Sequence, residues 1–168
     1  MSNLLAHRCG APAARRRNGG SKRQICPQVR VRRADKSRVR RCLFVDDEPL
    51  IPSSIRRLLR AEPYECVFAE HPHAALVACR AGPFDVVVSD FRMPEMNGVE
   101  LLREVRVLLP ESVRLLLTGQ SCPIATVAAL RDGTLHDVLL KPFERETLAG
   151  AIRAALSGEL QQQVRSHP

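Results

Sequence analysis

Short apolar runs alternate with amphipathic segments from Cys42 to the end of the chain. The runs are four to seven residues long and rich in Val and Leu, which is typical of strands buried on both faces of a parallel sheet. We expect five strands, at residues 42–46, 64–69, 85–89, 113–117 and in the run that ends at Lys141. Pro142 ends the last strand, because proline has no N–H to donate to a ladder.

The segments between these runs have the spacing of helices. Near 51–61, Ile51, Ile55 and Leu58 recur at i, i+4 and i+7 and therefore share one helix face. Further helices are expected near 72–81, from about Leu101 onward, near 124–131, and in a closing segment that carries Leu148 and Ile152. Five β/α repeats with short joints predict an α/β domain, a doubly wound parallel sheet with helices on both faces.

Positive charge is concentrated in the first part of the chain. Residues 1–40 contain twelve Lys and Arg and one acidic residue, Asp35, whereas the other 128 residues carry 14 basic and 17 acidic side chains. With few large apolar side chains to bury, residues 1–40 are expected to be a disordered basic extension. The folded domain is then expected at 41–157, followed by a polar tail at 158–168.

Hydropathy and cysteine spacing argue against a membrane protein, a zinc protein and a disulfide-linked secreted protein. No apolar stretch approaches the roughly 18–20 residues that span a bilayer, and the N-terminus lacks an apolar signal core, so we expect a cytoplasmic protein without a membrane partner. The six cysteines form no C-x-x-C pair, so neither a zinc site nor a disulfide framework is indicated. Cys42 and Cys66 are expected to be reduced, structural thiols in strands. Cys122 is either a loop thiol without a role or an exposed reactive one.

Candidate chemistry lies where the apolar runs end. Asp46 and Asp47 close the first run, Asp90 the third, Thr118 the fourth and Lys141 the fifth. Parallel strands present their carboxyl ends at one sheet edge, so these side chains are expected to converge there. Three ionised carboxylates at short range repel one another, so either a proton or a cation is expected among them, and Mg²⁺ is the favoured cation because it takes oxygen ligands, including those of phosphate. Lys141 would attract a negative substrate, Thr118 would donate to a phosphoryl oxygen, and a carboxylate would attack phosphorus.

The blocks VDDEP, SDFRMPEMNGVELL, LLLTG and LLKPF resemble the signature blocks of the response-regulator receiver domain of two-component signalling, over about Arg41 to Leu156. The resemblance implies a flavodoxin-like (βα)5 fold with strand order 2-1-3-4-5 and a cis peptide bond between Lys141 and Pro142. It also implies that Asp90 is the phosphoacceptor. Mg²⁺ would be held by Asp46, Asp47, Asp90 and the backbone carbonyl of Arg92. Thr118 and Lys141 would contact the phosphoryl group.

The same resemblance implies a phosphoacceptor signalling domain rather than an enzyme, and because the sequence leaves no room for a second folded domain, we expect it to be stand-alone. Its phosphoryl group would come from a histidine kinase or a phosphotransfer protein, and its output would pass to an unknown protein target. One position departs from the family pattern, because Val138 stands where many receivers carry a Tyr or Phe that relays the signal. His136 is either a surrogate for that ring or, as the simpler interpretation, a surface histidine without a role.

Three alternatives remain open at the level of sequence. Asp46 and Asp47 could cap the following helix, with Thr118 in a turn and Lys141 as a solvated strand end. A receiver that keeps the fold but is never phosphorylated could serve as a constitutive protein-interaction module. The basic extension could contact nucleic acid electrostatically, although it has no aromatic residue for base stacking, or it could be inert or belong to an overextended start.

Overall fold

The computed structural model describes residues 38–119 and 124–160. The chain divides into two units, and all the described residues belong to the second, residues 37–168. The predicted disorder of the extension and the interpretation of Cys122 lie outside the described residues.

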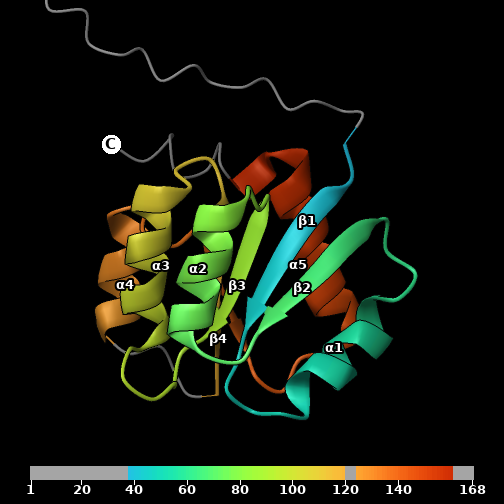
Figure 1. The fold of residues 1–168 in the computed structure, drawn as a ribbon, viewed down its shortest axis with the longest axis horizontal. Helices are drawn as coiled ribbons and strands as arrows, with labels where there is room; N and C mark the ends of the chain where they lie inside the picture. The colour runs from blue at the N-terminus through green and yellow to red at the C-terminus, as the bar shows by residue number, and fades with distance from the viewer. Residues whose placement is uncertain (1–37, 120–123, 161–168) are drawn as a thin grey trace, which may run out of the picture. The chain divides into compact units, whose positions relative to one another are not determined.

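A parallel sheet forms the centre of the second unit (Figure 1). Its strands are β1 (Arg40–Val45), β2 (Tyr64–Ala69), β3 (Val86–Asp90), β4 (Val113–Thr118) and β5 (Asp137–Leu140). All four neighbouring pairs are parallel, and the order across the sheet is β2-β1-β3-β4-β5. The predicted fold class and strand order are therefore confirmed.

Two layers of helices cover the sheet. Helices α2 (Pro72–Ala81), α3 (Gly98–Leu108) and α4 (Ile124–Arg131) lie on one face, and α1 (Ile51–Leu59) and α5 (Arg145–Ser157) lie on the other (Figure 1). Each face has its own apolar cluster, because alternate strand residues point to opposite sides. Phe44 packs toward α1 and α5, whereas Leu43 packs toward α2 and α3. None of the described helices is long and apolar enough to cross a bilayer.

Local sequence signals explain where several helices begin and end. Asn97 caps α3 through a capping box, in which its side chain accepts from the N–H of Glu100 and the Glu100 carboxylate accepts from the N–H of Asn97. Gly158 ends α5 with φ of 88°, a left-handed conformation that glycine adopts without a steric penalty. The cis peptide bond between Lys141 and Pro142 is present, as the resemblance implied.

The domain extends slightly beyond the boundaries expected from sequence. Arg40, which we assigned to the extension, is the first residue of β1. The Asp85 carboxylate accepts from the guanidinium groups of Arg38 and Arg40 at 2.6 and 2.9 Å. Leu160 is only 8% exposed and belongs to the apolar cluster beneath α5, past the expected end at 157. Ion pairing and apolar packing thus include in the folded domain residues that the sequence pattern assigned to the flanking segments.

Arg114 is buried in β4 without a carboxylate partner in the described residues. Its guanidinium donates to the backbone carbonyls of Thr134, Ser112 and Gly133 at 2.7, 2.7 and 3.0 Å. Burial, and secondarily the charge of Arg106, lower the pKa of Arg114 to about 10. This side chain ties the loop before β5 to the start of β4.

The interpretation of His136 as a surface histidine without a role is wrong. His136 is partly buried, and its Nδ1 accepts a hydrogen bond from the backbone N–H of Arg114 at 3.1 Å. Burial, followed by the charges of Arg114 and Arg106, lowers the pKa of His136 to about 4. A neutral imidazole therefore belongs to the folded state.

Candidate functional site

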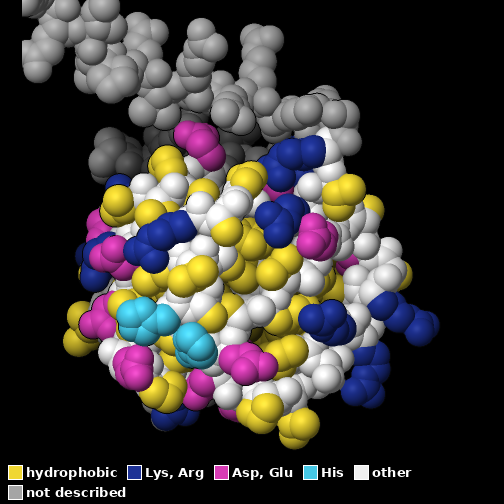
Figure 2. Space-filling model, in the orientation of Figure 1, with side chains coloured by type: hydrophobic (Ala, Val, Ile, Leu, Met, Phe, Trp, Pro, Cys, Tyr) yellow, Lys and Arg dark blue, Asp and Glu magenta, His cyan; other side chains and the backbone are white. Residues whose placement is uncertain are grey.

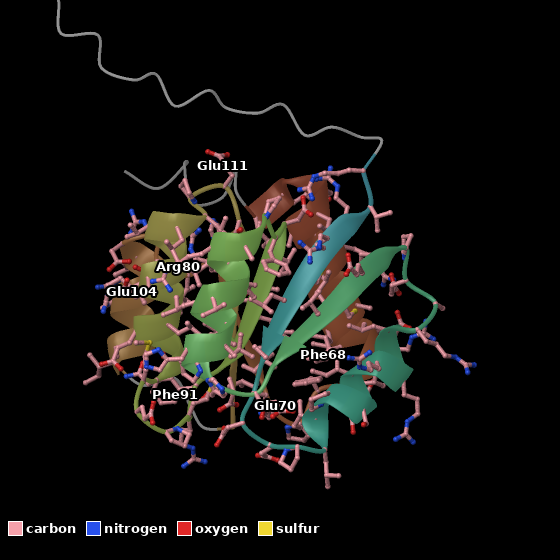
Figure 3. The ribbon with its side chains drawn as sticks, in the orientation of Figure 1. Phe68, Glu70, Arg80, Phe91, Glu104 and Glu111 are labelled. Atoms are coloured by element: carbon pink, nitrogen blue, oxygen red, sulfur yellow. The ribbon has the colours of Figure 1, made fainter. Side chains whose placement is uncertain are left out.

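The predicted site lies at the carboxyl edge of the sheet. Figure 3 shows this edge at Glu70 and Phe91, which follow β2 and β3, whereas Glu111, which precedes β4, lies at the opposite edge. Asp90 is the last residue of β3, Thr118 is the last residue of β4, and both are buried. Parallel pairing aligns these strand ends, so side chains far apart in sequence share one region of the surface.

Backbone hydrogen bonds hold the strand ends in place. The N–H of Asp46 donates to the carbonyl of Ala69 at 3.2 Å, which couples the end of β1 to the end of β2. The N–H of Lys141 donates to the carbonyl of Thr118 at 2.7 Å, so pairing of β4 with the chain continues one residue past β5. These bonds fix the backbone from which Asp46 and Lys141 project.

Lys141 brings together side chains from three segments. Its Nζ lies 2.6 Å from Oδ1 of Asp90 and 3.0 Å from Oδ2 of Asp46. The two carboxylates are 8% and 5% exposed as residues, so this ammonium group offsets much of the cost of bringing them together. The alternative of a solvated strand-end lysine is therefore wrong.

The remaining oxygens of the two carboxylates accept from backbone amides. The N–H of Arg92 donates to Oδ2 of Asp90 at 2.6 Å, and the N–H of Glu48 donates to Oδ1 of Asp46 at 2.9 Å. Each carboxylate is thus held at one oxygen by the chain that follows it and at the other by Lys141. This arrangement fixes their orientation before any ligand binds.

The ionisation of Lys141 reflects two opposed effects. Burial lowers its pKa, but hydrogen bonds and ion pairs with Asp90 and Asp46 raise it by more, so the pKa lies above the ordinary value for lysine. The side chain is therefore charged at neutral pH. A fixed positive charge beside a buried carboxylate suits a site that receives an anionic group.

The predicted metal ligands Asp47 and Arg92 lie next to these carboxylates in the chain. Asp47 is exposed, and the N–H of Arg92 donates to Asp90, while the assignment of the Arg92 carbonyl to Mg²⁺ stays a prediction. Within residues 38–119 and 124–160, no three His, Cys, Asp or Glu side chains are grouped in a way that would hold a metal ion. The two carboxylates that share Lys141 nevertheless fit a hard divalent cation, because both are oxygen donors directed at one positive centre.

Gly98 is a residue of the site that the sequence analysis did not single out. Its N–H donates to the carbonyl of Phe91 at 2.9 Å, and a Cβ at this position would lie 2.1 Å from the backbone oxygen of Asp90. The loop after β3 can therefore return to the end of that strand only if residue 98 lacks a side chain. The Asn97-Gly98 pair was the available signal, because it marked both a turn and the helix cap.

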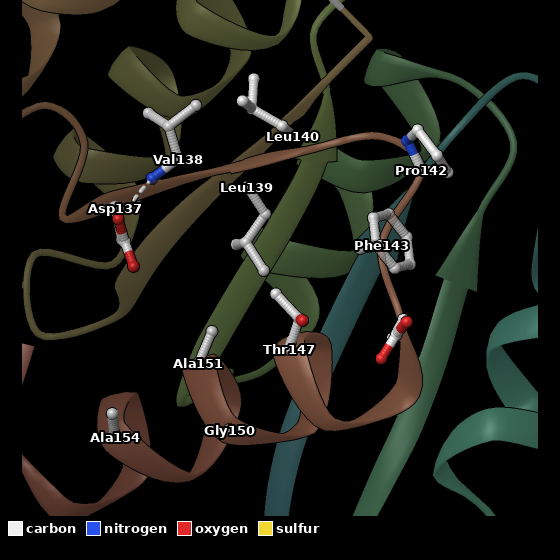
Figure 4. Close-up of a pocket in the computed structure, with 11 residues that line it drawn as sticks. Asp137, Val138, Leu139, Leu140, Pro142, Phe143, Thr147, Gly150, Ala151 and Ala154 are labelled. Atoms are coloured by element: carbon white, nitrogen blue, oxygen red, sulfur yellow. Dashed lines mark hydrogen bonds between the residues drawn. The ribbon is translucent and has the colours of Figure 1, made fainter.

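An open groove lies between β5 and α5, with a volume of about 610 Å³ (Figure 4). Leu139, Phe143 and Thr147 point into the space between the strand and the helix, whereas Val138 and Leu140 point away from α5. Val138 instead packs against the apolar cluster on the α2, α3 and α4 side of the sheet. The position where many receivers carry a ring thus holds a small, partly buried aliphatic side chain.

A doubly wound parallel sheet with two buried carboxylates and a lysine at its carboxyl edge defines the class of α/β proteins that bind anionic ligands at strand ends. Comparison with known proteins identifies the family within this class. The model of the response regulator receiver domain matches residues 42–153, and the chain belongs to this family.

Curated relatives include proteins named as transcriptional regulatory proteins. The chain is 36% identical over 115 residues to the transcriptional regulatory protein ZraR of Salmonella typhimurium, covering 68% of this chain and 26% of that protein. It is 34% identical over 128 residues to the transcriptional regulatory protein TrcR of Mycobacterium tuberculosis, covering 76% of this chain and 49% of that protein. The chain thus spans between about a quarter and a half of these relatives.

Solved structures give the same family. The signal receiver domain of an HD domain-containing protein from Pseudomonas fluorescens Pf-5 has a TM-score of 0.68 at 30% identity, covering 74% of this chain and 99% of that chain. The chemotaxis protein CheY4 of Vibrio cholerae has a TM-score of 0.64 at 29% identity, covering 70% and 99%. These matches cover nearly the whole of each solved chain.

Proposed function

We propose that this chain is a phosphorylation-switched receiver that accepts a phosphoryl group on Asp90 from a histidine kinase or a phosphotransfer protein. The observation that carries the proposal is the position of Lys141 Nζ, 2.6 Å from Asp90 Oδ1 and 3.0 Å from Asp46 Oδ2. The protein would catalyse only its own modification and its own dephosphorylation. We also propose that it acts in the cytoplasm and that its output passes through a partner protein.

The transfer reaction follows from the groups at this edge. A carboxylate oxygen of Asp90 forms a bond to phosphorus while the bond between phosphorus and the donor imidazole nitrogen breaks, and the released nitrogen takes up a proton. Lys141 offsets the charge of the incoming phosphoryl oxygens. The Arg92 N–H holds Asp90 in one orientation. Thr118, buried at the end of β4, is proposed to donate to a phosphoryl oxygen.

Mg²⁺ is proposed as the resident metal. Asp46 and Asp90 would hold it, together with Asp47 and the backbone carbonyl of Arg92. When bound, the ion would neutralise charge that develops on the transferred group. The exposure of Asp47 leaves its carboxylate accessible for this purpose.

Intact-mass spectrometry after incubation with acetyl phosphate and Mg²⁺ tests the proposal. We expect a mass gain of one phosphoryl group that hydroxylamine removes, because an acyl phosphate is labile to nucleophiles. The gain should disappear in Asp90→Asn and persist in Asp137→Asn, a matched variant at the start of β5, away from the carboxyl edge. Phosphoryl labelling of Asp90→Asn would contradict the proposal. So would the absence of labelling in a parent protein that still binds metal in a way that EDTA reverses.

A second function, a phosphorylation-independent interaction module, is favoured by one observation. Val138 has no ring that could move between buried and exposed positions when Thr118 responds to a phosphoryl group. In that case, partners captured by the parent protein would bind Asp90→Asn with unchanged affinity. A loss of binding on substitution, or a gain on phosphorylation, would exclude this alternative.

A further inference from the structure

We propose that Cys42 and Cys66 form a reversible disulfide bond when a low-molecular-weight disulfide such as glutathione disulfide oxidises them. The two residues are register partners in the adjacent parallel strands β1 and β2. This inference concerns a modification site on the α1 and α5 face of the sheet and does not depend on phosphorylation of Asp90.

Register and side-chain direction place the two thiols together. Adjacent strands lie about 4.7–4.9 Å apart, within the Cα separation of about 4.4–6.8 Å that a disulfide accepts. Both cysteines pack into the apolar cluster beneath α1 and α5. Two residues further along the same strands, the register partners Phe44 and Phe68 stack with ring centroids 5.3 Å apart. Side chains of this register column therefore meet on one face.

The two thiols differ in access. Cys42 is fully buried, whereas Cys66 is partly exposed. Burial raises the pKa of Cys66, although the Arg56 guanidinium partly counteracts it, and burial raises the pKa of Cys42 by a larger amount. Cys66 is consequently the thiol that meets an oxidant first, and Cys42 is the resolving thiol. Both steps are slow at neutral pH, because the thiolate is the attacking form.

The reaction balances with one molecule of glutathione disulfide. The thiolate of Cys66 attacks one sulfur of the oxidant, the glutathione S–S bond breaks, and one glutathione leaves. The thiolate of Cys42 then attacks the sulfur of Cys66 in the mixed disulfide, and the second glutathione leaves. The two thiol protons pass to the two released glutathiones, so the protein loses two electrons and two protons.

The position of β2 makes the bond reversible. The Cα separation of neighbouring strands suits a disulfide, but its two Cβ atoms lie only about 3.5–4.5 Å apart, so the side chains of this register pair must tilt toward one another through a local shift of β2. β2 pairs only with β1 in the described sheet, and an edge strand can make this shift. The resulting strain makes the disulfide easier to reduce than a relaxed structural one.

Peptide mapping of the full chain tests this pair. The parent protein is incubated with excess glutathione disulfide at mildly alkaline pH, its free thiols are alkylated, and it is digested with trypsin. We expect a linked pair of peptides, residues 42–56 and 61–80, that dithiothreitol separates. Peptide 61–80 also contains Cys79, so Cys66→Ser and Cys79→Ser identify the linked residue.

Cys79 is a matched control because it is buried in α2 and packs into the cluster on the opposite face of the sheet. The linked pair should persist in Cys79→Ser and disappear in Cys66→Ser and Cys42→Ser. Circular dichroism of each variant establishes that it is folded. Glutathione retained on Cys66 without a link to Cys42, or a linked pair that persists in Cys66→Ser, would overturn the proposal.

Discussion

Substitution of Gly98 by alanine tests how closely the acceptor loop is packed. Gly98 begins α3, and a Cβ there would lie 2.1 Å from the backbone oxygen of Asp90 and 2.7 Å from Cδ1 of Leu116. The Leu116 methyl group is the end of a side chain and can move. The Asp90 oxygen belongs to the backbone at the end of β3, so the loop or the strand must shift.

The magnitude follows from the nearer contact. Overpacking a well-packed site lowers the free energy of unfolding by about 1–3 kcal/mol. Because the backbone oxygen cannot move away as a side chain can, we take the upper value of about 3 kcal/mol. Alanine also restricts the unfolded chain, which returns up to about 1 kcal/mol. We expect Gly98→Ala to lower the free energy of unfolding by about 2 kcal/mol. Because the shift involves the acceptor residue, phosphoryl labelling of Asp90 should fall as well.

Gly150→Ala is the matched control. Gly150 lies inside α5, and nothing lies within 4 Å of a Cβ built there. Alanine is favoured over glycine within helices by about 0.5–1 kcal/mol, so this variant should be more stable than the parent and be labelled normally. Urea unfolding, followed by circular dichroism, measures both variants. A Gly98→Ala protein as stable as Gly150→Ala would refute the steric argument.

Three further predictions concern charged and titrating groups. His136 binds its proton with a pKa near 6.5 when unfolded and about 4 when folded, so its contribution to stability is lost as pH falls through this window. Between pH 7 and pH 4.5, the parent should lose about 2 kcal/mol more than His136→Asn in urea unfolding, and equal slopes would contradict this. Arg114→Met leaves buried carbonyls without donors and should cost about 2–4 kcal/mol, whereas exposed Arg131→Met should change the unfolding free energy by less than about 0.5 kcal/mol. Lys141→Met leaves two neighbouring carboxylates without their shared cation and should cost about 2 kcal/mol, part of which Asp90→Asn should restore in the double variant. A fully additive double variant would show that the two carboxylates do not repel one another.

Much of the fold could be predicted because local pattern and global topology agree. Short Val- and Leu-rich runs separated by helical periods admit few arrangements, and parallel strands present their carboxyl ends at one edge. The meeting of Asp46, Asp90 and Lys141 follows from that geometry. Sequence did not indicate which oxygen each amide would hold, nor that Arg92 would use its N–H, because those details depend on how each loop leaves its strand.

The residues that sequence analysis missed depend on partners that are far away in the sequence. Arg114 appears in the run VRLLLT as an isolated charge, and nothing near it indicates that its partners are carbonyls about twenty residues later. His136 is polar and lies before a strand, which suggested the surface, yet its acceptor nitrogen meets the N–H of Arg114. Asp85 similarly binds arginines more than forty residues earlier in the chain. Pattern analysis detects periodicity within a segment and cannot detect such partners.

The two edge strands of the sheet, β2 and β5, differ in how readily a second chain could pair with them. β5 has four residues and is followed directly by Lys141 and Pro142, so it offers a short row of free backbone groups to a second chain. β2 has six residues and contains no proline. Glu65 is the only charged residue of β2, and its exposed carboxylate pairs with Arg41 at 3.0 Å. Replacing Glu65 with an uncharged residue that favours strands would therefore make β2 the strand at which self-association through strand addition begins. The α2 and α3 face, by contrast, carries charges of both signs (Figure 2).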